Sequence, residues 1–202
     1  IEKKSSVLYL GCDLKKFNIK KKTSSNKKPI ILWNHRWEFD KNPDLFFNTL
    51  FKLKKENIDF ELALLGEQFK EYPKIFDEAQ EKLSDHILQF GYCQTFKEYA
   101  QWLWRADILP VTSNQDFFGI SIVEASYCNA YPILPKRLSY PELFDIKENP
   151  NYFYESDKEF YQKLKYSLLN HKKHTKKASN LVKKYDWKEI VFIYDKTLND
   201  FK

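Results

Sequence analysis

Apolar and polar positions follow two different periods along this chain, and the period switches repeatedly from residue 29 onward. Short apolar runs, typical of buried strands, alternate with stretches in which apolar residues recur every three or four positions, as in amphipathic helices. The predicted strands are 30–34, 60–65, 87–90, 107–111 and 131–134, and the helices between them are 43–57, 72–83, 96–105 and 120–128. Strands that alternate with helices predict an α/β fold, a Rossmann-like, doubly wound parallel sheet.

The two ends of the chain differ from this alternating middle. Beyond residue 135 the pattern predicts a short turn at 140–144 and helices near 157–170, 174–185 and 187–200. Before residue 29, residues 4–11 read as a short strand, and the Lys-, Ser- and Asn-rich segment to residue 28 has too little apolar content to pack. We therefore expect three parts: an interdomain strand and basic linker (1–28), a Rossmann-like domain (29–150) and C-terminal helices packed on it (151–202). An opening linker suggests that another domain precedes it.

Glycine marks the strand ends of the predicted sheet. The chain has only four glycines, and Gly66, Gly91 and Gly119 each follow a predicted strand. In open α/β sheets the ligand crevice lies at the carboxyl ends of the strands, where the backbone turns sharply or approaches a ligand. Gly119 also precedes the helix 120–128, whose first N–H groups have no partner within the helix and carry the positive end of its dipole. This arrangement is typical of phosphate binding.

Charged residues near these strand ends suggest a ligand chemistry. Glu124 lies among apolar residues of the helix 120–128, and a buried carboxylate needs hydrogen-bond donors such as sugar hydroxyls. Arg36 and Lys41 lie in the loop after the first strand, where two cations can neutralise a diphosphate without a metal and act as electrophilic catalysts. The alternatives are a Glu124 side chain that reaches solvent and cations that are merely exposed. We expect His35, between two tryptophans, to be packed rather than catalytic.

Charge and cysteine content indicate which binding partners, disulfides and metal sites this protein can have. The net charge is +6, but residues 1–28 and 171–202 are basic and residues 29–170 are acidic. Basic ends are compatible with RNA or an acidic lipid surface, although lysine runs are usually solvated. Three distant cysteines favour neither a disulfide framework nor a zinc site, and the lysines around His171 and His174 disfavour a metal. No apolar run approaches the roughly 20 residues of a membrane span. We therefore predict a soluble, cytoplasmic protein without a metal site.

Several separated motifs together resemble the C-terminal, nucleotide-sugar-binding half of a retaining GT-B glycosyltransferase. These motifs are Arg36 with Lys41 five positions later, Gly66 after the second strand, Phe90-Gly91 after the third, and the stretch from Asp116 through Phe118-Gly119 to Glu124. Within that superfamily, the segments 33–41, 64–67, 117–119, 131–136 and 140–142 are most similar to the tRNA-queuosine mannosyltransferase group. The resemblance covers roughly residues 29–150.

The resemblance implies a role for each matching residue. Arg36 and Lys41 would hold the donor diphosphate, Glu124 would bind the ribose, and Asp116 would contact the transferred sugar, so that Arg36, Lys41 and Asp116 form the catalytic set. The donor site would also include Gly66, Gly91, Tyr92, Phe118, Gly119 and Ile120. Two positions depart from the family: Asp116 replaces a Glu, and Asn129 replaces a Gly but tolerates the left-handed conformation.

The resemblance also implies a reaction and partners. Mannose would pass from GDP-mannose, or another nucleotide sugar, to queuosine in tRNA, with retention and without a metal or other cofactor. An N-terminal GT-B domain would hold the acceptor, and the helix 187–200 would return toward it, so this chain alone would bind the donor but be inactive. The alternatives are a lipid-linked or polysaccharide acceptor, or a non-catalytic module that binds nucleotides or RNA.

Overall fold

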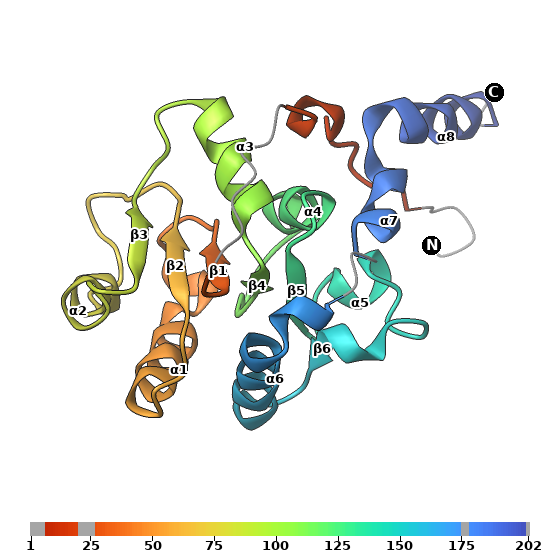
Figure 1. The fold of residues 1–202 in the computed structure, drawn as a ribbon. Helices are drawn as coiled ribbons and strands as arrows, with labels where there is room; N and C mark the ends of the chain where they lie inside the picture. Colours follow the sequence, from red (N-terminus) through yellow and green to blue (C-terminus); the bar gives the residue numbers. More distant parts are fainter. Residues whose placement is uncertain (1–6, 20–26, 175–177, 201–202) are drawn as a thin grey trace.

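A six-stranded parallel sheet in the order β3-β2-β1-β4-β5-β6 forms the centre of the molecule (Figure 1). The computed structural model describes residues 7–19, 27–174 and 178–200. The strands are β1 (Ile30–Trp33), β2 (Glu61–Leu64), β3 (Ile87–Phe90), β4 (Ile108–Pro110), β5 (Tyr131–Pro135) and β6 (Phe153–Tyr154). The five predicted strands and the Rossmann-like α/β class are confirmed. The two-residue β6 was not predicted, because so short a run shows no period.

The helices lie close to their predicted positions. They are α1 (Pro43–Lys55), α2 (Ile75–Lys82), α3 (Phe96–Arg105), α4 (Ile120–Tyr127), α5 (Tyr140–Leu143), α6 (Asp157–Leu169), α7 (Ala178–Val182) and α8 (Trp187–Asn199). The helix predicted at 174–185 is in part α7 followed by a 3₁₀ turn, Lys183–Tyr185, and residues 175–177 of it lie outside the described residues. Helix α1 begins where the sequence dictates, because Asn42 caps it and Pro43 has no N–H to satisfy.

The sheet separates two layers of helices, each with its own apolar cluster. Ile30 and Leu32 of β1 face the cluster that includes residues of α3, α4 and α7. Ile31 and Trp33 face the opposite cluster, with α1, α2 and α6. Because successive side chains of a strand point to opposite faces, a fully apolar strand is buried on both. This explains why β1 reads as a continuous apolar run.

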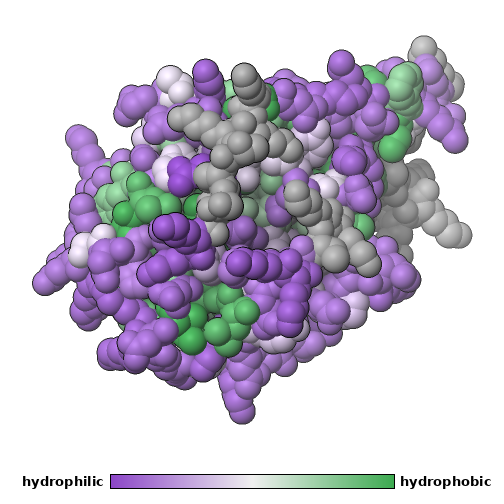
Figure 2. Space-filling view, in the orientation of Figure 1, coloured by the Kyte–Doolittle hydropathy of each residue, from purple (hydrophilic) through white to green (hydrophobic). Residues whose placement is uncertain are grey.

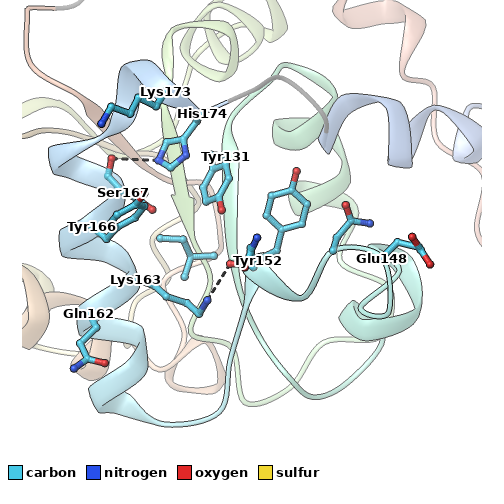
Figure 3. A pocket seen from close by; sticks show the side chains of 12 residues that line it. Tyr131, Glu148, Tyr152, Gln162, Lys163, Tyr166, Ser167, Lys173 and His174 are labelled. Atoms are coloured by element: carbon cyan, nitrogen blue, oxygen red, sulfur yellow. Dashed lines mark hydrogen bonds between the residues drawn. The ribbon is translucent and has the colours of Figure 1, made fainter.

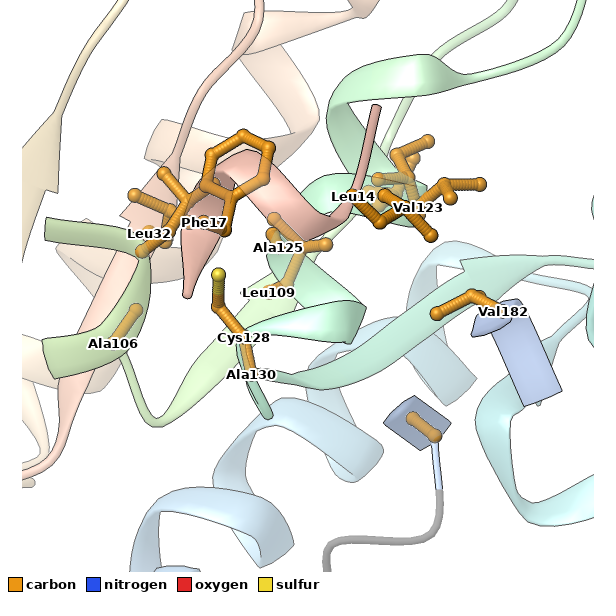
Figure 4. Close-up of a cluster of buried hydrophobic side chains, with 14 of the residues drawn as sticks. Leu14, Phe17, Leu32, Ala106, Leu109, Val123, Ala125, Cys128, Ala130 and Val182 are labelled. Atoms are coloured by element: carbon orange, nitrogen blue, oxygen red, sulfur yellow. The ribbon is translucent and has the colours of Figure 1, made fainter. Parts of the chain in front are cut away.

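The segment before β1 departs from the prediction. Of the predicted strand 4–11, residues 4–6 lie outside the described residues and residues 7–11 form no strand, and Cys12 makes only an isolated bridge with Asp186. Leu14 and Phe17 are fully buried, and Figure 4 shows them beside Val123 and Ala125 of α4. The 3₁₀ turn Lys15–Phe17 places these two apolar side chains, three residues apart, on the core side, while Lys15 and Lys16 between them remain partly exposed. The prediction that this segment is too polar to pack is therefore wrong for residues 12–17, whereas residues 20–26 lie outside the described residues.

The face in Figure 2 is mostly polar, with several separate apolar patches, one of which lies at α8. Phe192, Ile193 and Leu198 of that helix are exposed. That α8 returns toward a further domain stays a prediction, as do the three domain boundaries. In the part of the chain that the structure describes, no helix combines the length and apolar character needed to cross a bilayer.

Candidate functional site

A cavity of about 400 Å³ opens beside the carboxyl ends of β1, β2 and β3. Each of these strands is followed by a loop that supplies lining residues: Arg36 after β1, Gly66 after β2 and Tyr92 after β3. Glu124 of α4 completes the wall. Four predicted site residues from four segments thus come together, because parallel strands end at one edge of the sheet. The volume lies within the range of small-molecule pockets.

Glu124 points into the molecule rather than to solvent. Its side chain is 12% exposed, the Tyr99 hydroxyl donates to Oε2 at 3.0 Å, and Lys16 Nζ lies 3.4 Å from Oε1. Burial raises the pKa of Glu124, and the charge of Lys16 and the Tyr99 hydrogen bond oppose this rise. The pKa of Tyr99 is well above its ordinary value, chiefly through burial, so Tyr99 stays a donor. The alternative of a solvent-exposed Glu124 is therefore wrong.

Arg36 is the most accessible cation of the predicted set. Its side chain is 56% exposed and pairs with Glu38, with a distance of 3.0 Å between Nη2 and Oε2. A guanidinium that is half in solvent loses little by exchanging a surface carboxylate for a ligand phosphate. Arg36 can therefore turn toward an anion in the cavity that it lines.

Lys41 and Asp116 form a second group, which is absent from the lining of that cavity. Lys41 is buried, donates to the Gln115 carbonyl oxygen at 2.7 Å, and lies 3.1 Å from Asp40 and 3.9 Å from Asp116. The Tyr140 hydroxyl donates to Asp116 at 3.1 Å. Two carboxylates share one ammonium here, so the group as a whole is not cationic. This arrangement differs from the freely available Lys41 that the sequence suggests.

The three strand-end glycines serve different purposes. All have positive φ, but a Cβ on Gly66 would lie 2.0 Å from the His35 carbonyl oxygen, whereas nothing lies within 4 Å of one on Gly91. A Cβ on Gly119 would lie 3.1 Å from the Tyr140 ring and 3.8 Å from Asp116. Gly66 therefore permits the approach of the loop after β1, and Gly119 brings the start of α4 against the Asp116 group. Only Gly91 borders open space.

The remaining predicted backbone positions surround the start of α4. Gly119 caps that helix in the left-handed conformation, and Ile120 is its half-exposed first residue. The Phe118 carbonyl accepts a hydrogen bond from Ser139, and its ring packs edge-on against Tyr185. Phe118 thus anchors the loop through its side chain, Gly119 is buried beside it, and Ile120 is the exposed residue at the start of the helix.

Histidine 35 is packed, as expected. It is 3% exposed and makes an edge contact with the Trp33 ring, at 5.3 Å between ring centres. Burial, reinforced by the nearby Lys41, lowers its pKa to about 3. Its Nδ1 lies 3.3 Å from the Ser121 hydroxyl, while Nε2 has no hydrogen-bond partner. His35 is therefore a neutral side chain that supports the loop carrying Arg36.

A larger cavity, of about 660 Å³, lies elsewhere and contains none of the predicted site residues. Figure 3 shows it between β5 and α6, with the His174 ring against Tyr131. Tyr131 opens β5, so this cavity borders the amino ends of the strands. Polar groups along it bond to backbone carbonyls: His174 to that of Ser167, and Lys163 to that of Asn151. Among the described residues, no three His, Cys, Asp or Glu side chains are placed to hold a metal ion.

Three contributors to the strand-end site were not predicted. Asn34 donates to the Ser121 carbonyl oxygen at 2.8 Å and to the Tyr99 hydroxyl, and Tyr99 and Lys16 then hold Glu124. Tyr99 reads as an ordinary aromatic residue of an amphipathic helix, and Lys16 as one lysine among many. Asn34 directly follows a strand, which was the one signal in the sequence that could have identified it.

Comparison with known proteins found related sequences and folds. Residues 15–185 match the family "Glycosyl transferases group 1". The tRNA-queuosine alpha-mannosyltransferase of Drosophila melanogaster is 39% identical over 157 residues, which are 74% of this chain and 41% of that protein.

Two solved structures share the fold. A glycosyltransferase from Rickettsia africae superposes with a TM-score of 0.77 at 20% identity, covering 100% of this chain and 57% of its own. Anabaena HepE, solved in complex with UDP, gives a TM-score of 0.76 at 18% identity, with 96% and 57% covered. The chain thus spans about half the length of the proteins that it resembles.

Proposed function

Because this chain belongs to the glycosyl transferases group 1 family, we propose that it is the donor-binding half of a retaining, metal-independent mannosyltransferase that modifies queuosine in tRNA. Its donor is GDP-mannose, and an N-terminal GT-B domain completes the enzyme and holds the acceptor. The observation that carries this proposal is the convergence of Arg36, Gly66, Tyr92 and Glu124 on one cavity at the strand ends. The acceptor and the sugar are proposed from the name of the Drosophila relative. The cytoplasmic location stays a prediction.

The cavity suits a nucleoside diphosphate. The Glu124 carboxylate accepts the ribose hydroxyls, Arg36 pairs with the diphosphate, and the exposed Tyr92 lies beside the base. A fixed cation at the diphosphate assists catalysis, because the leaving group gains negative charge as its bond to carbon breaks. Gly91, with open space beside it, lets the base approach the backbone there.

The Asp116 group takes the transferred sugar. Lys41 Nζ and the Tyr140 hydroxyl both lie near Oδ2 of Asp116, at 3.9 and 3.1 Å. That carboxylate accepts sugar hydroxyls, and the backbone of Phe118, Gly119 and Ile120 faces the sugar and phosphate. Lys41 contributes less free charge to the diphosphate than Arg36, because it already serves two carboxylates.

The first test is calorimetric titration of this chain with GDP, GDP-mannose, UDP and UDP-glucose in chelator-containing buffer without magnesium. We expect the GDP ligands to bind in preference to the UDP ligands. Preference for UDP would overturn the donor, and a requirement for added magnesium would overturn metal independence. The full-length protein should then transfer mannose to queuosine-containing tRNA with retained anomeric configuration. Transfer to a lipid-linked or polysaccharide acceptor instead would replace the proposed acceptor.

Replacing Arg36 by alanine should weaken the binding of GDP by roughly 1.5–3 kcal/mol, because a charge-assisted hydrogen bond to the diphosphate is lost. Titration calorimetry measures the change. Arg105→Ala is the matched control. Arg105 is the last residue of α3 and lies near the amino ends of the strands, so its loss should leave GDP affinity unchanged. Equal affinity of the Arg36 variant and the parent would contradict the diphosphate assignment.

A further inference from the structure

The segment before the sheet places a cation beside the candidate donor site. Lys16 Nζ lies 3.4 Å from Glu124 Oε1 and 5.1 Å from the ring centres of Phe17 and Phe96. Phe96 and Glu124 both line the 400 Å³ cavity. The ammonium is therefore held by a carboxylate and two aromatic faces at the edge of this cavity, which restricts its position.

The residues on either side of Lys16 fix it in place. Leu14 and Phe17 are fully buried, and the Trp104 indole donates to the Phe17 carbonyl oxygen at 2.7 Å. The backbone N–H groups of Leu14 and Lys15 both donate to Asp186 at 3.1 Å. With its neighbours anchored, Lys16 is presented to Glu124 by the fold and is not a freely moving surface lysine.

Glu124 needs a positive charge close by. Its carboxylate is 12% exposed, and burial favours its neutral form. The Cys12 thiol and the Tyr99 hydroxyl beside it carry no charge, because burial raises the pKa of Cys12 to about 11 and that of Tyr99 well above its ordinary value. Lys16 is the charged group that favours the ionised carboxylate, which accepts hydroxyl donors better than the neutral acid does.

We propose that Lys16 is a positioning residue for nucleotide binding, which keeps the Glu124 carboxylate ionised and oriented toward the ribose hydroxyls. This proposal rests on the proposed function, because it takes Glu124 as the ribose acceptor. It makes the segment 12–17 part of the donor site, although that segment contacts the ribose only through Glu124. The affinity for nucleotide then depends on how well this segment is docked.

The test compares K16Q, K16R and K15Q in titrations with GDP at pH 5.5 and pH 8. K16Q should bind GDP about fivefold more weakly than the parent at pH 5.5, the scale of a partly exposed ion pair. It should recover most of that loss at pH 8, where Glu124 is ionised even without Lys16. K16R should behave as the parent. K15Q is the matched control, because Lys15 pairs with Asp186 and Glu189 outside the cavity.

Two outcomes would overturn the proposal: a K16Q loss that is equal at both pH values, or tighter GDP binding by K16Q, which would mean that Lys16 competes with the nucleotide. A second measurement needs no ligand. The ¹³C carboxyl titration of Glu124, assigned with E124Q, should shift to higher pH in K16Q but not in K15Q. An unshifted titration refutes the role of Lys16. A shifted titration in a chain that binds none of the nucleotides refutes the proposed function instead.

Discussion

Replacing Gly66 by alanine should lower the free energy of unfolding by about 3–5 kcal/mol, the largest effect that we expect from one methyl group in this chain. The added Cβ would lie 2.0 Å from the His35 carbonyl oxygen, and φ at this position is +118°. The opposing atom belongs to the backbone and cannot swing aside. Trp37 also joins the loop after β1 to the loop after β2. Its backbone N–H donates to the Glu67 carbonyl, and its indole donates to the Leu65 carbonyl.

Urea denaturation gives this free energy directly, and Gly91 provides the control. Gly91 also has a positive φ, of +98°, but nothing lies within 4 Å of its added Cβ. Gly91→Ala should therefore cost only the backbone strain, about 1–3 kcal/mol. Equal losses in the two variants would show that contact with the His35 carbonyl is not the cause. If Gly66→Ala does not fold, Gly66→Ala and Gly91→Ala can be compared by the yield of soluble protein.

Acidification should destabilise the fold through His35. The unfolded chain binds a proton on this residue at its ordinary pKa of 6.5, whereas the folded chain does so only near 3, because burial disfavours the charged imidazole. The stability that the neutral ring contributes is therefore complete above about pH 6.5 and falls as the pH decreases toward 3. The free energy of unfolding should fall by about 1.4 kcal/mol per pH unit below pH 6.5, which makes about 2.7 kcal/mol at pH 4.5.

Free energies of unfolding between pH 7.5 and 4.5 test this prediction. His35→Gln should remove most of the decline between pH 6.5 and 5, a window in which ordinary carboxylates titrate little. His174→Gln should remove a smaller part, since His174 is half-buried and its pKa is also lowered by burial. If the glutamine variant does not fold, the ¹H–¹³C signal of the His35 ring in the parent protein decides: titration near pH 6.5 in the folded state would contradict the prediction.

The fold was readable from sequence because its strands are buried on both faces. β1 is a four-residue apolar run, and the buried faces of the helices repeat every three or four residues. The backbone conformation of one residue was also predicted from its type. Asn129, which stands where the family has glycine, adopts the expected left-handed conformation with φ of +74°. Leu14 and Phe17 were missed because the lysines around them dominate the composition, and only a 3₁₀ turn aligns the two.

The residues of the candidate site could be predicted only in part from the sequence. The strand-end rule places Arg36, Gly66, Tyr92 and Glu124 along one edge, and that required only the order of strands and helices. What Lys41 contacts depends on side-chain packing between loops 75 residues apart in sequence, where its ammonium meets Gln115 and Asp116. The pairing of Glu124 with Tyr99 likewise joins two helices, α3 and α4, whose mutual orientation no local pattern encodes.

The docked segment 12–17 also constrains the order in which the molecule assembles. The hydrogen bond from Leu14 to Asp186 joins residues 172 positions apart, and the entropy of closing so long a loop must be met before that contact contributes anything. We therefore expect Lys16 to reach Glu124 among the last steps of folding. During synthesis, residues 12–17 leave the ribosome early but cannot dock until residue 186 has also emerged. The cavity at the strand ends therefore stays incomplete on a nascent chain until almost the whole domain has been made.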